Sequence, residues 1–205
     1  CVSIDLEIDP KTNPIQSFAG VRHRTEEAVE FKRGNLIDVL SKLDNYAQQA
    51  NFLLGHNFIH FDAKHLENTK NDLQLLKKPI IDTLWLNPLA FPRNPYHSLV
   101  KHYQDGRLQA GHVNDPRLDA ELVLTVLDNQ IRALSDIDHV DPDTTRAYHY
   151  LTTTRSDHAG FGAVFEFVRG APRPGPAEAQ SAIRGLLRGA ACSHQIETVI
   201  PEAER

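Results

Sequence analysis

One stretch near the start of the chain decides the fold: Val2-Ser3-Ile4-Asp5-Leu6-Glu7-Ile8-Asp9. Its apolar residues alternate strictly with small or acidic ones, which is typical of a β-strand whose successive side chains point to opposite faces of a sheet. One face therefore carries the apolar residues, and the other carries Asp5 and Glu7. Their Cα atoms should lie about 6.5–7 Å apart, too close for two unpaired carboxylates unless a cation lies near them. A half-solvated edge strand with its acids facing water is the alternative.

Length and composition indicate a globular protein with one main core. The chain has 205 residues, of which 40% are hydrophobic and 24% are charged, enough for one core and a small appendage. No apolar run approaches the roughly 20 residues that cross a bilayer, and Cys1 and Cys192 lack the spacing of a zinc site or a disulfide framework. We therefore expect a cytoplasmic protein without a membrane partner. A net charge of −5 argues against a general nucleic-acid coat but allows a local basic groove beside an acidic site.

Short strands and helices alternate along the first part of the chain. Residues 15–21 and 28–31 are expected to be strands that form a meander with the first one. Asn35 has the side chain of a helix N-cap, and the helix after it is expected to end near residue 50. Two short apolar runs, residues 52–55 and 79–81, are typical of strands buried on both faces beside parallel neighbours. The pattern predicts an α/β fold with a mixed sheet flanked by helices.

The remaining residues are expected to be mostly helical. Residues 84–109 contain three prolines and are predicted to be irregular. Asp115-Pro116 then opens a long helix, whose apolar face is predicted to carry Leu118, Leu122, Val123, Val126 and Leu127. We predict a main domain of residues 1–134, a helical appendage of residues 135–170, and a proline-rich linker with a terminal helix and tail in residues 171–205.

Two further acids lie at informative positions. Asp62 follows a buried strand and begins a helix, so its carboxylate can lie at the carboxyl end of the sheet, where open α/β folds bind ligands. The alternative is that Asp62 serves only as an N-cap. Asp119 borders the buried face of the long helix, where a carboxylate either caps a neighbouring group or binds a cation.

These four acids, in this order, resemble the DEDD (DnaQ-like) group of 3′–5′ exonucleases, which have a ribonuclease H-like fold. Ser3-Ile4-Asp5-Leu6-Glu7 resembles the first motif of the group. Gly55-His56-Asn57 with Phe61-Asp62 resembles the second, and Asn114-Asp115-Pro116 with Asp119-Ala120 resembles the third. The likeness covers about residues 1–130. The stretch of residues 81–97 resembles more narrowly the exonuclease domains attached to bacterial RecQ-type DNA helicases.

The resemblance implies hydrolysis of phosphodiester bonds with two divalent cations, Mg²⁺ or Mn²⁺. Carboxylates suit both ions, because hard cations prefer oxygen ligands. Asp5 would bridge the two ions, Glu7 and Asp119 would serve one of them, and Asp62 would help to position the other. Nucleic acid is the implied partner, DNA more than RNA, with a covalently linked helicase motor as a further one. The lack of any methionine, even at position 1, leads us to expect a domain of a longer polypeptide.

One position departs from the family pattern. The third motif normally has a histidine five residues before its last aspartate as the general base for the attacking water, but Asn114 stands there. An amide cannot accept a proton at neutral pH. His112 is the candidate that could replace it, with His97 and Lys101 as further candidates. The tyrosine variant of the family fails too, since Asp115 holds the position of that tyrosine.

Substrate contacts are expected from four residues: Asn57, Phe58, His97 and Lys101. Asn57 would support the substrate or the metal ligands, and Phe58 could stack on a terminal base, as aromatic side chains do in single-strand binders. Phe61 and Tyr96 could stack in the same way, although a core position is the more usual one for Phe61. The later histidines, His149 among them, are expected at the surface.

Two other functions are compatible with the sequence. Asn114 motivates the first, a catalytically degenerate domain that keeps the fold and binds nucleic acid or a protein without cleaving it. The second is a metal-dependent phosphohydrolase that acts on small nucleotides. The four acids favour an exonuclease over a binding module, because binding alone does not require converging carboxylates.

Overall fold

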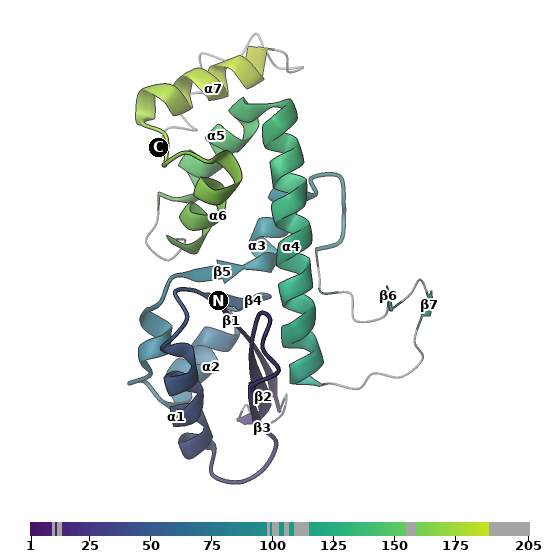
Figure 1. The fold of residues 1–205 in the computed structure, drawn as a ribbon, viewed down its shortest axis with the longest axis vertical. Helices are drawn as coiled ribbons and strands as arrows, with labels where there is room; N and C mark the ends of the chain where they lie inside the picture. The colour runs from purple at the N-terminus through teal and green to yellow at the C-terminus, as the bar shows by residue number, and fades with distance from the viewer. Residues whose placement is uncertain are drawn as a thin grey trace. The chain divides into compact units, whose positions relative to one another are not determined.

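The computed structural model describes residues 1–9, 11, 14–97, 99, 103–104, 107–108, 115–154 and 159–188. The chain divides into two compact units, Cys1–Gln130 and Ile131–Arg205. Helix α4 (Pro116–Val140) contributes residues to both units (Figure 1). The segment boundaries predicted at residues 134 and 170 stay predictions.

A mixed sheet of five strands forms the centre of the first unit, in the order β3-β2-β1-β4-β5. The strands are β1 (Val2–Ile8), β2 (Ile15–Arg22), β3 (Ala28–Phe31), β4 (Leu53–Gly55) and β5 (Ile80–Asp82). Strands β1, β2 and β3 pair antiparallel, whereas β1 with β4 and β4 with β5 pair parallel. The predicted α/β class with a meander followed by parallel strands is confirmed.

Strand β1 is the central strand, and its two faces differ as its alternation predicts. Val2, Ile4 and Leu6 are buried in the hydrophobic core. On the opposite face Ser3 is also fully buried, so that face is covered by protein. The alternative of an edge strand with its acids facing water is therefore wrong.

Helices cover both faces of the sheet within the first unit (Figure 1). Helix α1 (Leu36–Ala47) and helix α2 (Asp62–Thr69) lie on one face, and the first part of α4 lies on the other. The predicted N-cap is confirmed, because the side chain of Asn35 accepts a hydrogen bond from the Ile37 N–H at 3.1 Å. The short 3-10 helix η1 (Gln74–Lys77) follows α2 and contributes Leu75 to the core.

The prediction of irregular structure over residues 84–109 is wrong in part. Helix α3 (Thr83–Ala90) contains Pro88, and the short strands β6 (Tyr103–Gln104) and β7 (Arg107–Leu108) pair antiparallel. The helix forms because the Asp82 carboxylate caps the Leu84 N–H at 3.0 Å and because Leu86 and Ala90 are buried. Capping and burial together outweigh the hydrogen bond that the proline removes.

Helix α4 begins at Pro116, as the sequence predicts, but its buried face differs by one residue position near the start. Val123 and Leu127 are buried as predicted, whereas Leu118 is 52% exposed and Ala120 is fully buried in its place. The helix is therefore rotated so that Asp119, at 6% exposed, lies toward the sheet.

Three helices make up most of the described part of the second unit: α5 (Pro142–Thr152), α6 (Ala159–Arg169) and α7 (Pro176–Arg188). Helix α5 packs against both α6 and α7. Buried residues of this unit include Phe161, Phe165 and Ile183. Within the described residues of the chain, no helix is both long enough and apolar enough to cross a membrane.

His149 is an interior residue of the second unit, so the expectation of a surface position is wrong. Its ring stacks on Phe165 with the centroids 5.7 Å apart, and the Arg169 guanidinium donates to Nδ1 at 2.8 Å. Burial, followed by the charge of Arg169, lowers the pKa of His149 to about 4. The imidazole is therefore neutral at physiological pH.

The close approach of Gly55, at the end of β4, to Phe58 gives a test of the packing in the loop after this strand. A Cβ at position 55 would lie 2.6 Å from the Phe58 Cβ, so Gly55→Ala should lower the free energy of unfolding by about 1–3 kcal/mol. Gly162→Ala is the control, because its Cβ would meet Thr153 at an ordinary 3.7 Å and alanine favours a helix by about 0.5–1 kcal/mol. Urea unfolding of both variants measures the effect, and equal stability of Gly55→Ala and the wild type would contradict the packing.

Candidate metal centre

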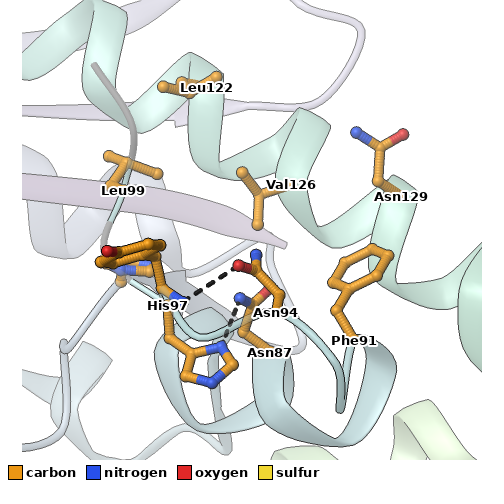
Figure 2. Close-up of a pocket in the computed structure, with 10 residues that line it drawn as sticks. Asn87, Phe91, Asn94, His97, Leu99, Leu122, Val126 and Asn129 are labelled. Carbon is orange, nitrogen blue, oxygen red and sulfur yellow. Dashed lines mark hydrogen bonds between the residues drawn. The ribbon is translucent and has the colours of Figure 1, made fainter. Parts of the chain in front are cut away.

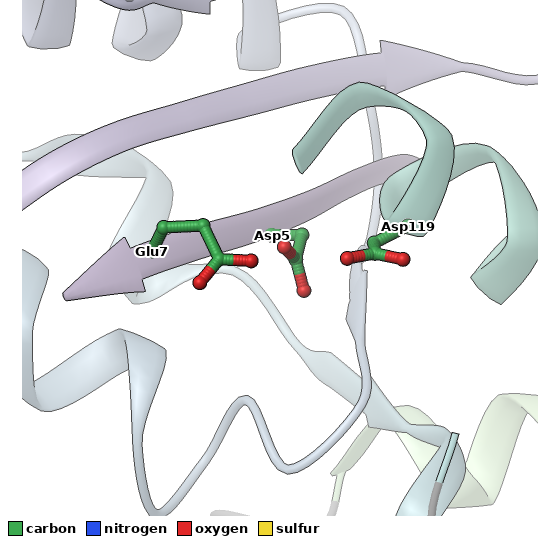
Figure 3. A group of neighbouring side chains, drawn as sticks. All are labelled: Asp5, Glu7 and Asp119. Atoms are coloured by element: carbon green, nitrogen blue, oxygen red, sulfur yellow. The ribbon is translucent and has the colours of Figure 1, made fainter. Parts of the chain in front are cut away.

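Three carboxylates converge above the carboxyl half of strand β1 (Figure 3). Asp5 and Glu7 come from β1, and Asp119 comes from the first turn of α4. One oxygen from each of the three lies within 4.8 Å of the others. Since Asp5 and Glu7 are half-buried and Asp119 is buried, the cluster is partly removed from water. Three of the four acids predicted from the sequence are thus brought into one group.

Local interactions at the start of α4 hold Asp119 in this position. The Asp115 carboxylate accepts from the Arg117 N–H at 3.0 Å, which caps the helix. The Arg117 guanidinium then donates to Glu30 Oε1 of β3 at 3.0 Å. A cap and a long-range ion pair together attach this helix end to the sheet. The N-terminal end of a helix also favours a negative charge such as that of Asp119.

Asp62, the fourth predicted acid, lies beside this group. It is 4% exposed, and its Oδ1 accepts a hydrogen bond from the Leu6 N–H at 3.2 Å. Leu6 stands between Asp5 and Glu7 in the chain, so this bond ties Asp62 to the strand that carries them. Burial, followed by the negative charge of Asp5, raises the pKa of Asp62 well above its ordinary value.

An open cavity of about 190 Å³ lies among these acids. Its lining residues come from β1, from the loop after β4, from α2 and from the segment after α3: Asp5, Leu6, Glu7, His56, Phe61, Asp62 and Leu99. The cavity joins the carboxylates to an aromatic ring and an imidazole. Such a lining can hold a cation and a group bound to it.

Asp82 is a residue that organises the site but was not among the predicted site residues. It is fully buried, and its carboxylate accepts hydrogen bonds from the backbone N–H groups of Asn57 at 2.8 Å, Ile59 at 3.0 Å and Leu84 at 3.0 Å. It therefore holds the loop after β4 and caps α3 at the same time. Its sequence signal is an acid directly after a buried strand and before a helix.

His56 has a defined hydrogen-bond role in this loop. The Thr83 hydroxyl donates its only hydrogen to the Gly55 carbonyl at 3.0 Å, so it must accept from His56 Nδ1 at 2.9 Å. We assign the neutral Nδ1–H tautomer on this basis. Burial lowers the pKa of His56, although the charge of Asp82 opposes the shift. Hydrogen bonding to the His97 backbone also opposes this lowering of the pKa, and the Nε2 atom is buried.

The structure corrects one of the predicted substrate contacts. Phe58 is fully buried in the hydrophobic core, so its ring cannot stack on a base. Phe61 is 41% exposed and lines the acidic cavity. The roles expected of these two rings are exchanged because Asn57 has a left-handed backbone, with φ of 65°, which turns the following residues out of a regular helical order.

The other predicted site residues fall in two groups. His97 is described and accepts at Nδ1 from Asn87 Nδ2 at 2.9 Å. Lys101, His112 and Asn114 lie outside the described residues, so the identity of the general base stays a prediction.

Comparison with known proteins adds no family assignment. No protein-family model matches the sequence, and no curated protein matches it either. The chemistry of the site therefore rests on its own residues.

The raised pKa of Asp62 predicts a dependence of stability on pH. Because the pKa of Asp62 is raised in the folded state, the neutral carboxyl stabilises the fold at pH values below the ordinary carboxyl range. This contribution to the free energy of unfolding is lost as the pH rises through the folded-state pKa. The amide of Asp62→Asn does not ionise, so the variant should not lose this stability, and its amide oxygen can still accept from the Leu6 N–H. In EDTA the free energy of unfolding of Asp62→Asn should exceed that of the wild type increasingly as the pH rises above the ordinary carboxyl range. Glu67→Gln, an exposed change on the same helix, is the control, and a parallel pH profile for Asp62→Asn and the wild type would contradict the assignment.

The three hydrogen bonds of Asp82 predict a positioning role that can be measured directly. In Asp82→Asn an NH₂ group faces a backbone donor, so at least one buried N–H loses its acceptor, at a cost of about 1–3 kcal/mol. Amide hydrogen exchange at Asn57 and Ile59 should become faster, while that of α1 changes little. Asp72→Asn removes an exposed ion pair with Lys70 and should leave both measurements near those of the wild type. Unchanged exchange in Asp82→Asn would show that other contacts hold the loop.

Proposed function

We propose that the protein is a metal-dependent 3′–5′ exonuclease that hydrolyses phosphodiester bonds of DNA at its acidic cluster. The observation that carries this proposal is the convergence of Asp5, Glu7 and Asp119 within 4.8 Å, although Asp119 is more than a hundred residues away in the chain. The adjoining Asp62 completes the order of acids that resembles the DEDD group. The mixed sheet is compatible with the ribonuclease H-like fold of that group, and we propose that fold for residues 1–130.

The donor set fits divalent cations. Its oxygens are carboxylates, which Mg²⁺ and Mn²⁺ prefer over nitrogen or sulfur ligands. Asp5, Glu7 and Asp119 would hold one ion, and Asp62 with Asp5 would hold a second. Burial and, after it, repulsion from Asp5 raise the pKa of Asp62, and a bound cation would oppose both effects. When bound, two such ions supply the Lewis acidity for phosphodiester hydrolysis.

The residues of the chain have separate tasks in this reaction. Water attacks the phosphorus of the last phosphodiester, and the bond from this phosphorus to the 3′ oxygen of the preceding nucleotide breaks. The products are a nucleoside 5′-monophosphate and a shortened strand with a new 3′ hydroxyl. His112 is the predicted acceptor of the proton from the water. Asp82 keeps the loop of residues 56–61 in place, and Phe61 at the cavity offers a ring face to the terminal base.

A degenerate binding domain remains the competing function, and Asn114 is the observation that favours it. Such a domain would bind nucleic acid or a protein without hydrolysis. We propose DNA as the substrate and a larger helicase-type protein as the context, because of the resemblance of residues 81–97 to exonuclease domains of RecQ-type helicases.

Hydrolysis can be tested with 5′-labelled single-stranded and double-stranded DNA and RNA, in Mn²⁺, Mg²⁺ or EDTA. The wild type should shorten DNA stepwise from its 3′ end in the presence of either metal and not in EDTA. Asp5→Asn should reduce the rate by about a hundredfold or more, the scale of losing one preorganised electrostatic group.

Asp38→Asn is the matched control, because Asp38 is an exposed acid on α1 and should leave the rate unchanged. Absence of shortening under every metal condition would contradict the proposal and favour the binding domain. Hydrolysis of mononucleotides alone would favour a phosphohydrolase of small nucleotides.

A further inference from the structure

We infer that a second cavity, between α3, the segment after it and α4, binds a single nucleobase of the strand that is cut at the acidic cluster. This inference rests on the proposed function for the identity of its ligand. The cavity has a volume of about 290 Å³, just below the roughly 300–1,000 Å³ typical of small-molecule sites. It is therefore large enough for one planar group and too small for several nucleotides.

Apolar side chains form two sides of this cavity (Figure 2). Leu122 and Val126 come from neighbouring turns of α4 and share one face of that helix. Phe91 and Leu99 come from the segment after α3. A planar ring placed between these sides would meet apolar surface, including the aromatic ring of Phe91, which favours the faces of nucleobases.

A chain of hydrogen bonds from Gln130 through Asn87 to His97 fixes the orientation of the polar groups at the cavity. Gln130 Nε2 donates to the Thr83 carbonyl at 2.8 Å and also lies 3.0 Å from Asn87 Oδ1. Because a carbonyl only accepts, this Gln130 atom is the amide nitrogen, and Asn87 therefore presents its own nitrogen to His97 Nδ1. In neutral His97 the hydrogen is then on Nε2, which is a donor.

His56 also lines this cavity, and its ring is held in place because its Nδ1 donates to the Thr83 hydroxyl. The amides of Asn94 and Asn129 also line the cavity. Donors and acceptors that are held at fixed positions around apolar walls match the edge of a nucleobase.

The lining excludes a phosphate as the main ligand. Among its ten described lining residues there is no lysine, arginine, aspartate or glutamate. A phosphate site would require cationic side chains or a helix N-terminus. A neutral, planar ligand with hydrogen-bonding edges is the class that remains, and in a nucleic acid this is the base.

The two cavities are neighbours, because His56 and Leu99 line both of them. A strand whose phosphodiester lies at Asp5 can therefore place a base in the second cavity. Base contacts there would hold the strand while the terminal nucleotide is removed. We would then expect the protein to bind a strand end that carries its base more tightly than an end that lacks it.

The test measures binding without hydrolysis, using uncharged nucleosides so that the acids do not repel the ligand. The four deoxynucleosides and deoxyribose are titrated in EDTA into ¹⁵N-labelled full-length protein and followed by NMR at the Asn94 and Asn129 side-chain amides. At least one nucleoside should produce saturating shifts, and deoxyribose should produce none. Asn129→Leu removes a polar edge and Val126→Phe fills the cavity, so each should weaken binding about tenfold or more. Asn45→Leu, an exposed change on α1, should leave it unchanged.

Each outcome has a defined consequence. Absence of shifts with every nucleoside, or equal binding by Asn129→Leu, Val126→Phe and the wild type, would overturn the inference. Asp5→Asn should retain nucleoside binding, because Asp5 does not line this cavity. Nucleoside binding without any exonuclease activity would support base binding at this cavity but reject the proposed reaction and the cut strand as the source of the base. Exonuclease activity without nucleoside binding would support the reaction and overturn the inference.

Discussion

Repulsion between carboxylates on one face of the central strand is the constraint on which the first unit depends. Asp5, Glu7 and Asp119 lie within 4.8 Å of one another, and Asp62 is buried beside them. The protein offsets part of the repulsion with the Leu6 N–H, which donates to Asp62, and with the start of α4, which favours a negative charge. The proposed divalent cations would reduce the repulsion among the four acids further, because they would place positive charge between the carboxylates.

The scaffold around the acids is held by buried polar contacts as well as by the apolar core. Asp82 joins β5, the loop after β4 and the start of α3 through three backbone hydrogen bonds. Gln130 joins α4 to α3 through Thr83 and Asn87. Buried hydrogen bonds of this kind have strict geometry, and removing one partner leaves the other without compensation. These contacts hold the loop after β4, α3 and the first part of α4 together.

The sequence predicts local features of this site better than non-local ones. Alternation along β1 is a property of neighbouring residues, so the face that carries Asp5 and Glu7 could be predicted. The exchange between Phe58 and Phe61 could not, because it depends on the left-handed backbone of Asn57. That conformation is held by Asp82, twenty-five residues further along the chain. A periodic pattern contains no information about such a contact.

The sheet order explains why the acids and the second cavity lie together. Strand β1 pairs antiparallel with β2 on one side and parallel with β4 on the other. The sheet therefore changes from antiparallel to parallel pairing at β1. In open α/β sheets, crevices form at such a point, outside the carboxyl ends of the parallel strands. Glu7, His56 and Thr83 all lie at or just after those ends. Strands β2 and β3 contribute none of the described residues that line either cavity. A substrate strand would therefore follow the ends of β1, β4 and β5, with its reacting bond over β1 and a neighbouring base toward α3 and α4.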